Sequence, residues 1–150
     1  MKTIFSFALL ILLLEACSSV PRFTSNRNRT NVKINNNEDL SSYKNLPVLE
    51  TQKGIASFYA DKYHGKITYG GEEYDMYGIS AAHPTYPMNT IVRVTNIENG
   101  KNIILRINDK MPFREDRIID LSFGAAQTLG FVNDGLKEVK IEVLKWGEEK

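Results

Sequence analysis

Thr90-Ile91-Val92-Arg93-Val94-Thr95-Asn96-Ile97, followed by Glu98-Asn99-Gly100-Lys101 and Asn102-Ile103-Ile104-Leu105-Arg106-Ile107-Asn108, is the stretch that decides the fold class. Two runs rich in β-branched residues, which favour strands, flank an Asn-Gly pair, which favours a tight turn. The stretch therefore predicts an antiparallel hairpin of two strands. Asp109 comes directly after it, at the end of the second strand rather than in its middle.

Further strand signals lie on both sides of this hairpin. Residues 54–60 and 117–121 have strand composition, and residues 76–82 are mildly apolar. Residues 137–144 alternate charged with apolar side chains, which predicts a strand with one buried face.

A short helix is predicted over residues 123–129, because Ser122 is a favoured N-cap residue and Gly130 a favoured terminator. About six strands, one or two short helices and no alternation of strands with helices indicate a mainly β protein. A small closed barrel is the favoured architecture, since closure removes the exposed edges that short strands would otherwise leave.

Composition favours one domain and excludes several classes of function. A chain of 150 residues suits a single domain, and 19 basic against 18 acidic residues give a net charge of +1, which offers no footprint for nucleic acid. The single cysteine, Cys17, leaves the rest of the chain without disulfides or thiolate metal sites. His64 and His83 are a poor zinc set by themselves, so no metal and no cofactor is expected.

The first 17 residues have the pattern of an export signal, in which a basic residue precedes a short apolar run. Leu14-Glu15-Ala16-Cys17 resembles a lipobox, the bacterial lipoprotein signal whose cysteine is acylated after cleavage. The other interpretation is an ordinary cleaved signal peptide. Residues 18–52, rich in Asn and Ser, are predicted to be a disordered tether, and residues 53–146 to be the barrel domain.

Polar and charged side chains gather in two stretches. Gly70-Gly71-Glu72-Glu73-Tyr74-Asp75 is followed by His83, and the second cluster is centred on Asp109. Paired glycines permit backbone conformations that are closed to other residues, so the first cluster is expected on a loop. A fold that brings the two stretches together would form a polar cleft on an apolar scaffold.

An ordered set of short motifs runs through residues 54–144. They are Gly54-Ile55-Ala56-Ser57-Phe58-Tyr59, His64-Gly65-Lys66, Gly71-Glu72-Glu73-Tyr74-Asp75, Ala81-Ala82-His83, Val92-Arg93-Val94-Thr95-Asn96, Asn99-Gly100, Arg106-Ile107-Asn108-Asp109, Pro112-Phe113, Arg117-Ile118-Ile119-Asp120-Leu121-Ser122 and Ala125-Ala126. Together they resemble the RlpA family, the rare lipoprotein A proteins, which are septal ring lytic transglycosylases. Each motif alone is weak, but the ordered set is specific.

The resemblance implies a six-stranded double-psi β-barrel, related to the barrels of expansins. It also implies a bacterial enzyme that cleaves peptidoglycan glycan strands lacking stem peptides. Three functional positions carry over by motif, Glu72, His83 and Asp109. Lys110 and Met111 depart from the Arg-Gly pair that is usual in the family after the aspartate.

The resemblance also implies where such a protein works. We expect a lipoprotein of the bacterial cell envelope that is anchored to a membrane by a lipid on Cys17. In a diderm bacterium this membrane is the outer membrane, and the protein lies on its periplasmic side. The expected partners are glycan strands, that membrane and cell-division proteins. Many family members carry a SPOR domain after the barrel, and none is expected here.

A lytic transglycosylase cleaves between N-acetylmuramic acid and N-acetylglucosamine without water, because the muramic acid's own 6-hydroxyl attacks and leaves a 1,6-anhydro end. One acid can serve both halves of the reaction if it is protonated near neutral pH. Asp109, which has apolar neighbours in the sequence, is the predicted acid. Glu72 is predicted to keep it protonated, to assist the 6-hydroxyl or to stabilise oxocarbenium charge. His83 either hydrogen-bonds a carboxylate or sugar, or is structural.

Aromatic side chains are candidates for sugar binding, although aromatic residues in strands are more often part of the core. Tyr59 and Tyr74 are predicted to line the cleft, with Phe113 and His64 as further contacts. Two other carboxylates are interpreted as turn or backbone-binding groups and left out of the catalytic set: Asp75 and Asp120.

Two other functions stay open on the sequence. One is an expansin-like module that binds peptidoglycan without cutting it, with Lys110 and Met111 reshaping the cleft. The other is a scaffold that recruits cell-division proteins through the tether.

Overall fold

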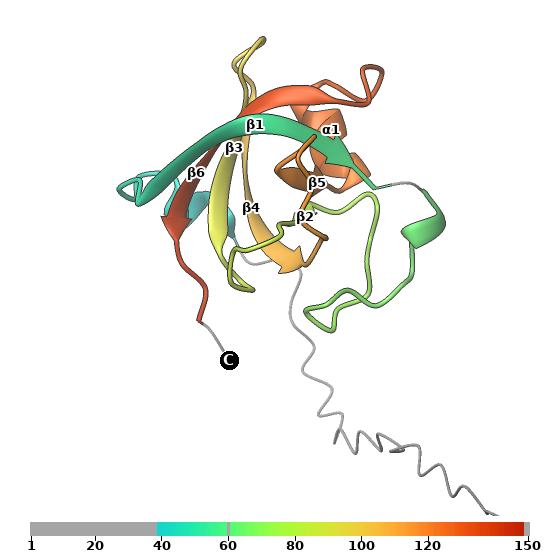
Figure 1. Cartoon of the computed structure of the whole chain (residues 1–150). Helices are drawn as coiled ribbons and strands as arrows, with labels where there is room; N and C mark the ends of the chain where they lie inside the picture. Colours follow the sequence, from blue (N-terminus) through green and yellow to red (C-terminus); the bar gives the residue numbers. More distant parts are fainter. Residues whose placement is uncertain (1–38, 60, 149–150) are drawn as a thin grey trace, which may run out of the picture. The chain divides into compact units, whose positions relative to one another are not determined.

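A computed structural model describes residues 39–59 and 61–148 of the chain. Six strands form a closed barrel in the order β1-β5-β2-β4-β3-β6 (Figure 1). Their bounds are Glu50–Phe58 for β1, Ser80–Ala82 for β2, Ile91–Asn96 for β3, Asn102–Asp109 for β4, Ile119–Leu121 for β5 and Lys137–Lys145 for β6. The predicted mainly β, six-stranded double-psi barrel is confirmed.

The predicted hairpin forms one side of this barrel. β3 pairs antiparallel with β4 from Ile91↔Arg106 to Thr95↔Asn102, and β6 pairs with the other edge of β3. β1 with β5 and β2 with β4 are parallel pairs, which need long crossover connections. The connection from β1 to β2, residues 59–79, extends from the barrel as a long loop with one 3-10 turn, Asp61–Tyr63 (Figure 1).

Alternate residues of the strands fill the barrel interior. The side chains with 0% exposure include Val92, Val94, Leu105, Ile107, Ile119, Leu121, Val139, Ile141 and Val143. Each such side chain contributes about 1.5–3 kcal/mol by leaving water. Because a chain with a single cysteine cannot form an internal disulfide, apolar packing stabilises the barrel.

Helix α1, Phe123–Leu129, begins and ends where the sequence predicts. Ser122 Oγ accepts a hydrogen bond from the N–H of Ala125 at 3.2 Å, which satisfies a donor in the first turn. Gly130 ends the helix with φ of 76°, a left-handed conformation that glycine adopts without strain.

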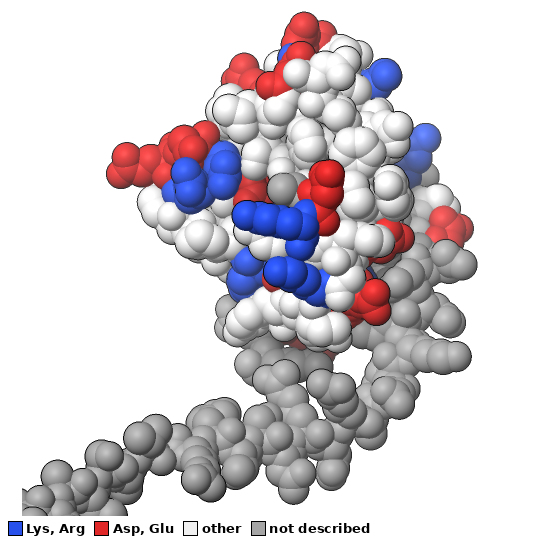
Figure 2. All heavy atoms as spheres, turned by 90° about the vertical axis from the view of Figure 1, so that its right-hand side faces the viewer, with Lys and Arg blue, Asp and Glu red and all other residues white. Residues whose placement is uncertain are grey.

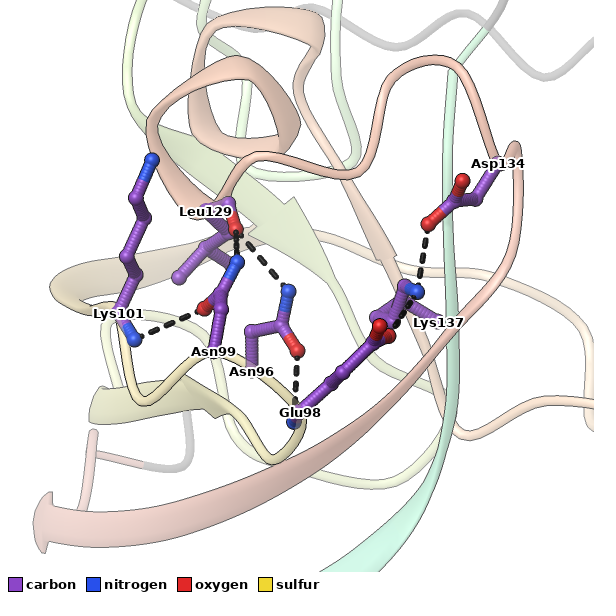
Figure 3. Close-up of polar contacts among 7 residues, drawn as sticks. All are labelled: Asn96, Glu98, Asn99, Lys101, Leu129, Asp134 and Lys137. Carbon is purple, nitrogen blue, oxygen red and sulfur yellow. Dashed lines mark hydrogen bonds and ion pairs between the residues drawn. The ribbon is translucent and has the colours of Figure 1, made fainter.

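The turn between β3 and β4 is attached to the end of α1 by a group of polar residues, here named the hairpin-turn cluster (Figure 3). Its members are Asn96, Glu98, Asn99, Lys101, Leu129, Asp134 and Lys137. The carbonyl of Leu129 accepts hydrogen bonds from Asn96 Nδ2 at 3.1 Å and from Asn99 Nδ2 at 3.0 Å. Lys137 forms ion pairs with Glu98 and Asp134. Both carboxylates of the cluster therefore have a cationic partner within it.

The boundary predicted between tether and barrel is placed too late. β1 begins at Glu50 rather than at residue 53, because residues 50–52 pair with β6 as far as Glu50↔Val143. A 3-10 turn, Leu40–Tyr43, precedes it within the predicted tether, and the side chain of Asp39 accepts a hydrogen bond from the N–H of Ser41 at its start. The predictions for residues 1–38, including the signal peptide and Cys17, lie outside the described residues. Within residues 39–59 and 61–148, no helix is long and apolar enough to cross a membrane.

Candidate active site

One row of residues crosses four neighbouring strands of the barrel. Ser57 of β1 pairs with Asp120 of β5, Asp120 pairs with Ala82 of β2, and Ala82 pairs with Asp109 of β4. Asp109 and Asp120 are therefore two strands apart, which corresponds to about 10 Å between their Cα atoms. The parallel pairings of β1 with β5 and of β2 with β4 create this row.

Both aspartates line a cleft of about 910 Å³, which is named the acidic cleft after these two residues. A volume of this size is typical of ligand sites. Its lining residues are Ser57, Phe58, Tyr59, Lys62, Tyr63, Lys66, Ile67, Thr68, Tyr74, Asp109, Lys110, Met111, Pro112, Arg114, Arg117, Asp120, Gly135 and Leu136. Figure 2 faces the side of the molecule from which the loop after β1 extends, and charged side chains of both signs lie close together there.

Asp109 is half-buried and its carboxylate is held by three donors. Oδ2 accepts a hydrogen bond from Tyr59 OH at 3.0 Å. Oδ1 accepts from the backbone N–H of Tyr69 at 2.7 Å and of Lys110 at 2.9 Å. Burial, then the charge of Asp109 and its hydrogen bond, raise the pKa of Tyr59 far above its usual range, so the phenol keeps its proton. The carboxylate is fixed in one orientation, with a protonated phenol beside it.

Asp120 is the second carboxylate of the acidic cleft, and only 9% of its surface is exposed. Its Oδ1 accepts a hydrogen bond from Ser57 Oγ and pairs with Arg117 Nε at 3.0 Å. A buried charge persists only when it is paired and hydrogen-bonded, and both partners are present here. The geometry therefore presents two aspartates, each held by its own partners, to one cleft.

Glu72 is not among the residues that line this cleft. Arg106 donates two hydrogen bonds to it, at 2.6 Å and 2.8 Å, and Asn108 Nδ2 donates a third at 3.1 Å. Burial by itself would raise the pKa of Glu72, but the hydrogen bonds from Arg106 and Asn108 and the Arg106 charge outweigh it and lower the pKa. Beside this clamp, the N–H of Gly70 donates to the carbonyl of Asn108 at 3.1 Å. Glu72 thus fastens the loop that supplies the Tyr69 N–H onto the end of β4.

His83 is buried, with 2% of its surface exposed, and also lies outside the cleft lining. Its Nδ1 accepts from the backbone N–H groups of Thr85 at 3.3 Å and Tyr86 at 3.1 Å, so the ring proton is on Nε2, 3.3 Å from Gln52 Oε1. Burial, followed by the charge of Lys110, lowers the pKa of His83 to about 4, and the imidazole is neutral at physiological pH. It therefore organises the loop after β2.

The backbone N–H of His83 donates to the carbonyl of Asp109 at 3.3 Å, and the Nζ of Lys110 donates to the carbonyl of Tyr86 at 2.6 Å. These two bonds attach the loop after β2 to the end of β4. Met111 is 6% exposed and forms part of the cleft wall. Asp109 is thus held from two sides, by the loop that Glu72 fastens and by the loop that His83 organises.

The four predicted sugar-binding residues separate into two groups. Tyr59 and Tyr74 line the acidic cleft, and their ring centroids lie 5.2 Å apart. His64 and Phe113 are not among its lining residues. His64 Nδ1 accepts from the N–H of Met76 at 3.2 Å within the loop, and Phe113 is 77% exposed.

The sequence interpretation left Asp120 out of the site, and the structure places it in the cleft with Ser57 and Arg117. A signal for Asp120 was present, because a carboxylate in the three-residue strand Ile119–Leu121 lies between two fully buried apolar residues. A charge at such a position needs partners from other strands. Asp75 matches its interpretation as a turn residue, since its Oδ1 accepts from the N–H of Tyr77 at 3.0 Å.

Metal ligands do not gather in the part of the chain that the structure describes. Among residues 39–59 and 61–148, no group of three or more His, Cys, Asp or Glu side chains is arranged to hold a metal ion. The chemistry that these residues can perform by themselves is proton transfer and electrostatic stabilisation by carboxylates.

A double-psi β-barrel with a carboxylate-lined cleft defines the class of this protein, and comparison with known sequences gives the family. The sequence model of the lytic transglycolase family matches residues 51–141. The chain therefore belongs to the lytic transglycolase family, and its barrel is of the RlpA type.

Three relatives, each named endolytic peptidoglycan transglycosylase RlpA, illustrate the similarity. The Pseudomonas aeruginosa protein is 54% identical over 89 residues, which are 59% of this chain and 26% of the relative. The Neisseria meningitidis protein is 52% identical over 105 residues (70% and 44%), and the Vibrio cholerae protein 50% identical over 94 residues (63% and 36%). The chain thus matches between 26% and 44% of the length of these relatives.

Solved structures share the fold. Streptomyces papain inhibitor superposes with a TM-score of 0.54 at 23% identity, covering 67% of this chain and 99% of the inhibitor. A mutant Clavibacter michiganensis expansin in complex with cellohexaose superposes with a TM-score of 0.53 at 17% identity, covering 67% of this chain and 54% of the expansin. At these identities the likeness shows the fold alone.

Proposed function

We propose that this protein is an endolytic peptidoglycan lytic transglycosylase, which cleaves the bond between N-acetylmuramic acid and N-acetylglucosamine and leaves 1,6-anhydro ends. Membership of the lytic transglycolase family and the names of the relatives support the reaction class. The observation that carries the proposal is the position of Asp109, at the end of β4 in a cleft that also holds Asp120 and three tyrosines.

Asp109 is the proposed acid and base. Its carboxyl group donates a proton to the oxygen of the departing N-acetylglucosamine, and its carboxylate then takes the proton of the 6-hydroxyl as that oxygen bonds to C1 of the muramic acid. One carboxyl group is thereby regenerated and no water is consumed. The phenol of Tyr59, which keeps its own proton, orients Asp109 through its hydrogen bond.

Asp120 is proposed to stabilise the oxocarbenium charge that develops on the muramic acid as the bond breaks. It is suited to this role because it lines the cleft, where a hydrogen bond from Ser57 and an ion pair with Arg117 fix its position. Glu72 and His83 are proposed to act as positioning residues, because each fastens a loop to the end of β4 that carries Asp109.

The membrane anchor, the cellular location, the form of the substrate and the partners are also proposals. Cys17 is proposed to carry a lipid that anchors the protein in the bacterial envelope, on the periplasmic side of the outer membrane in a diderm. Residues 1–17 are then the lipoprotein-type signal segment, which ends in this cysteine and is cleaved before it. Residues 18–49 then give the barrel reach towards the cell wall. Glycan strands without stem peptides are the proposed substrate, and cell-division proteins are proposed partners.

The proposal is tested by incubating the protein with peptide-stripped glycan strands and analysing the products by mass spectrometry. We expect fragments with 1,6-anhydro-muramic acid ends from the wild type and none from Asp109→Asn. Folded wild-type protein that yields no such ends between pH 5 and pH 8 overturns the proposal. If both proteins then bind glycan equally, the expansin-like binding module is the correct function.

A further inference from the structure

Two lysines on the loop after β1 carry charges without a carboxylate partner. Lys62 Nζ and Lys66 Nζ lie over the ring of Tyr63, 5.3 Å and 5.7 Å from its centroid, and all three residues line the acidic cleft. None of the ion pairs within residues 39–59 and 61–148 includes either lysine. An ammonium group over an aromatic face keeps its full charge, because the ring contributes only a quadrupole. Both groups can therefore bind an anion that enters the cleft.

The other cationic residues of the cleft are already engaged. Arg117 and Arg114 form ion pairs at 3.0 Å and 2.8 Å, and Lys110 Nζ donates to a backbone carbonyl at 2.6 Å. The lining contains five Lys or Arg residues but only two carboxylates, those of Asp109 and Asp120. Lys62 and Lys66 are thus the cationic residues of the cleft whose ammonium groups are held by neither a carboxylate nor a hydrogen bond to the protein.

Aromatic contacts connect these lysines to the candidate acid. The ring of Tyr63 packs edge-on against Tyr59 with centroids 5.6 Å apart, and Tyr59 OH donates to Asp109 Oδ2 at 3.0 Å. Tyr63 is 40% exposed, so it also offers surface to an incoming sugar. The two lysines and Asp109 therefore line the same cleft and are connected through Tyr63 and Tyr59.

We propose that Lys62 and Lys66 form a subsite for the carboxylate on the N-acetylmuramic acid residue of the substrate. The inference rests on the proposed function. The lactyl ether of this sugar ends in a carboxyl group, which is an anion when free and a neutral amide when it carries a stem peptide. Two ammonium groups attract the anion and gain nothing from the amide, so this subsite selects strands whose lactyl group is free.

The test compares two glycans that have the same sugar backbone and differ in the charge of the lactyl group. One is peptide-stripped glycan with free lactyl carboxylates, and the other is the same glycan with its carboxylates converted to methylamides. Equilibrium binding and anhydro-product formation are measured for the wild type, for Lys62→Gln/Lys66→Gln and for a control, Lys53→Gln/Lys145→Gln. The control removes the same formal charge outside the cleft, and it includes Lys145, which lies 5.7 Å from the ring centroid of Tyr43.

We expect the wild type and the control to bind the free-carboxylate glycan about tenfold more tightly than the methylamide, and Lys62→Gln/Lys66→Gln to bind both alike. The preference of the wild type should also weaken as salt is raised. Equal binding of both glycans by the wild type, or an undiminished preference in Lys62→Gln/Lys66→Gln, overturns the inference. Retained preference without any product overturns the proposed function alone, because binding is read independently of cleavage.

Discussion

The two ends of strand β4 are built on opposite principles. At its start, both carboxylates of the hairpin-turn cluster, those of Glu98 and Asp134, have an ion-pair partner within the cluster, Lys137 (Figure 3). At its end, Asp109 accepts hydrogen bonds from neutral donors only, and three lysines of the cleft, Lys62, Lys66 and Lys110, have no carboxylate partner among the described residues.

This difference separates polar groups that hold the fold from polar groups that face a substrate. A self-satisfied cluster contributes stability and leaves nothing over for a ligand. The cleft end is stabilised indirectly, by Glu72 and His83, which lie behind Asp109 and leave its carboxylate accessible to the cleft. Changes at the two ends should therefore have different consequences, in activity at one end and in stability at the other.

The largest expected effect is that of Asp109→Asn on cleavage. The rate should fall by about 10²–10⁴-fold, the usual contribution of a general acid, while the amide oxygen still accepts from the loop N–H groups and the fold is kept. Anhydro-product formation and thermal unfolding measure the two quantities. Asp134→Asn makes the same chemical change in the hairpin-turn cluster and should leave the rate unchanged. Equal rates in both variants would remove the distinction between the ends.

Glu72→Gln should destabilise the protein strongly although it lies outside the cleft. It leaves the largely buried guanidinium of Arg106 without its ion pair, which costs about 2–4 kcal/mol of unfolding free energy. Since the pKa of Glu72 is lowered in the folded state, its stabilisation is present above its usual value of 4.5 and is lost as pH falls through the folded pKa. Denaturant titrations at a series of pH values should show the variant's deficit in full at pH 7 and a smaller deficit as pH falls below 4.5. Glu98→Gln, whose side chain is 72% exposed, is the matched control and should cost less.

His83 predicts a second pH dependence, in a different window. Its pKa is depressed from 6.5 to about 4, so the unfolded chain binds this proton first as pH falls. The contribution of His83 to stability is complete above pH 6.5 and declines as pH falls from 6.5 to about 4, by about 3 kcal/mol. His83→Gln should remove this slope and leave the Glu72 transition at lower pH. A slope that persists in the variant would show that His83 is not its source.

The smallest expected effect is that of Asn96→Ala at the hairpin-turn cluster. Asn96 is 1% exposed and donates to the Leu129 carbonyl, which keeps its second donor, Asn99. The loss should be about 1–2 kcal/mol of unfolding free energy, with the cleavage rate per folded molecule unchanged. Asn99→Ala, at a less buried position, should cost less. A reduced cleavage rate in either folded variant would contradict the separation of the two ends.

Local signals predicted much of the fold. The Asn-Gly hairpin, the capped helix α1 and the last strand lie where the sequence placed them, because turn chemistry, capping and alternation act over a few residues. The start of β1 was missed because residues 50–52 are polar or exposed and owe their strand structure to pairing with β6. Strand pairing of this kind overrides local composition.

The sequence by itself determined the class of fold and one end of the site: a hairpin that ends at Asp109, with apolar faces that must be buried. The tertiary structure alone decided what stands beside Asp109. It placed Asp120 two strands away in the same row, turned Glu72 towards Arg106, and brought Lys62 and Lys66 to the same cleft. The reason is that parallel crossovers set neighbours by strand order and register, and neither quantity is encoded in the spacing of residues along the chain.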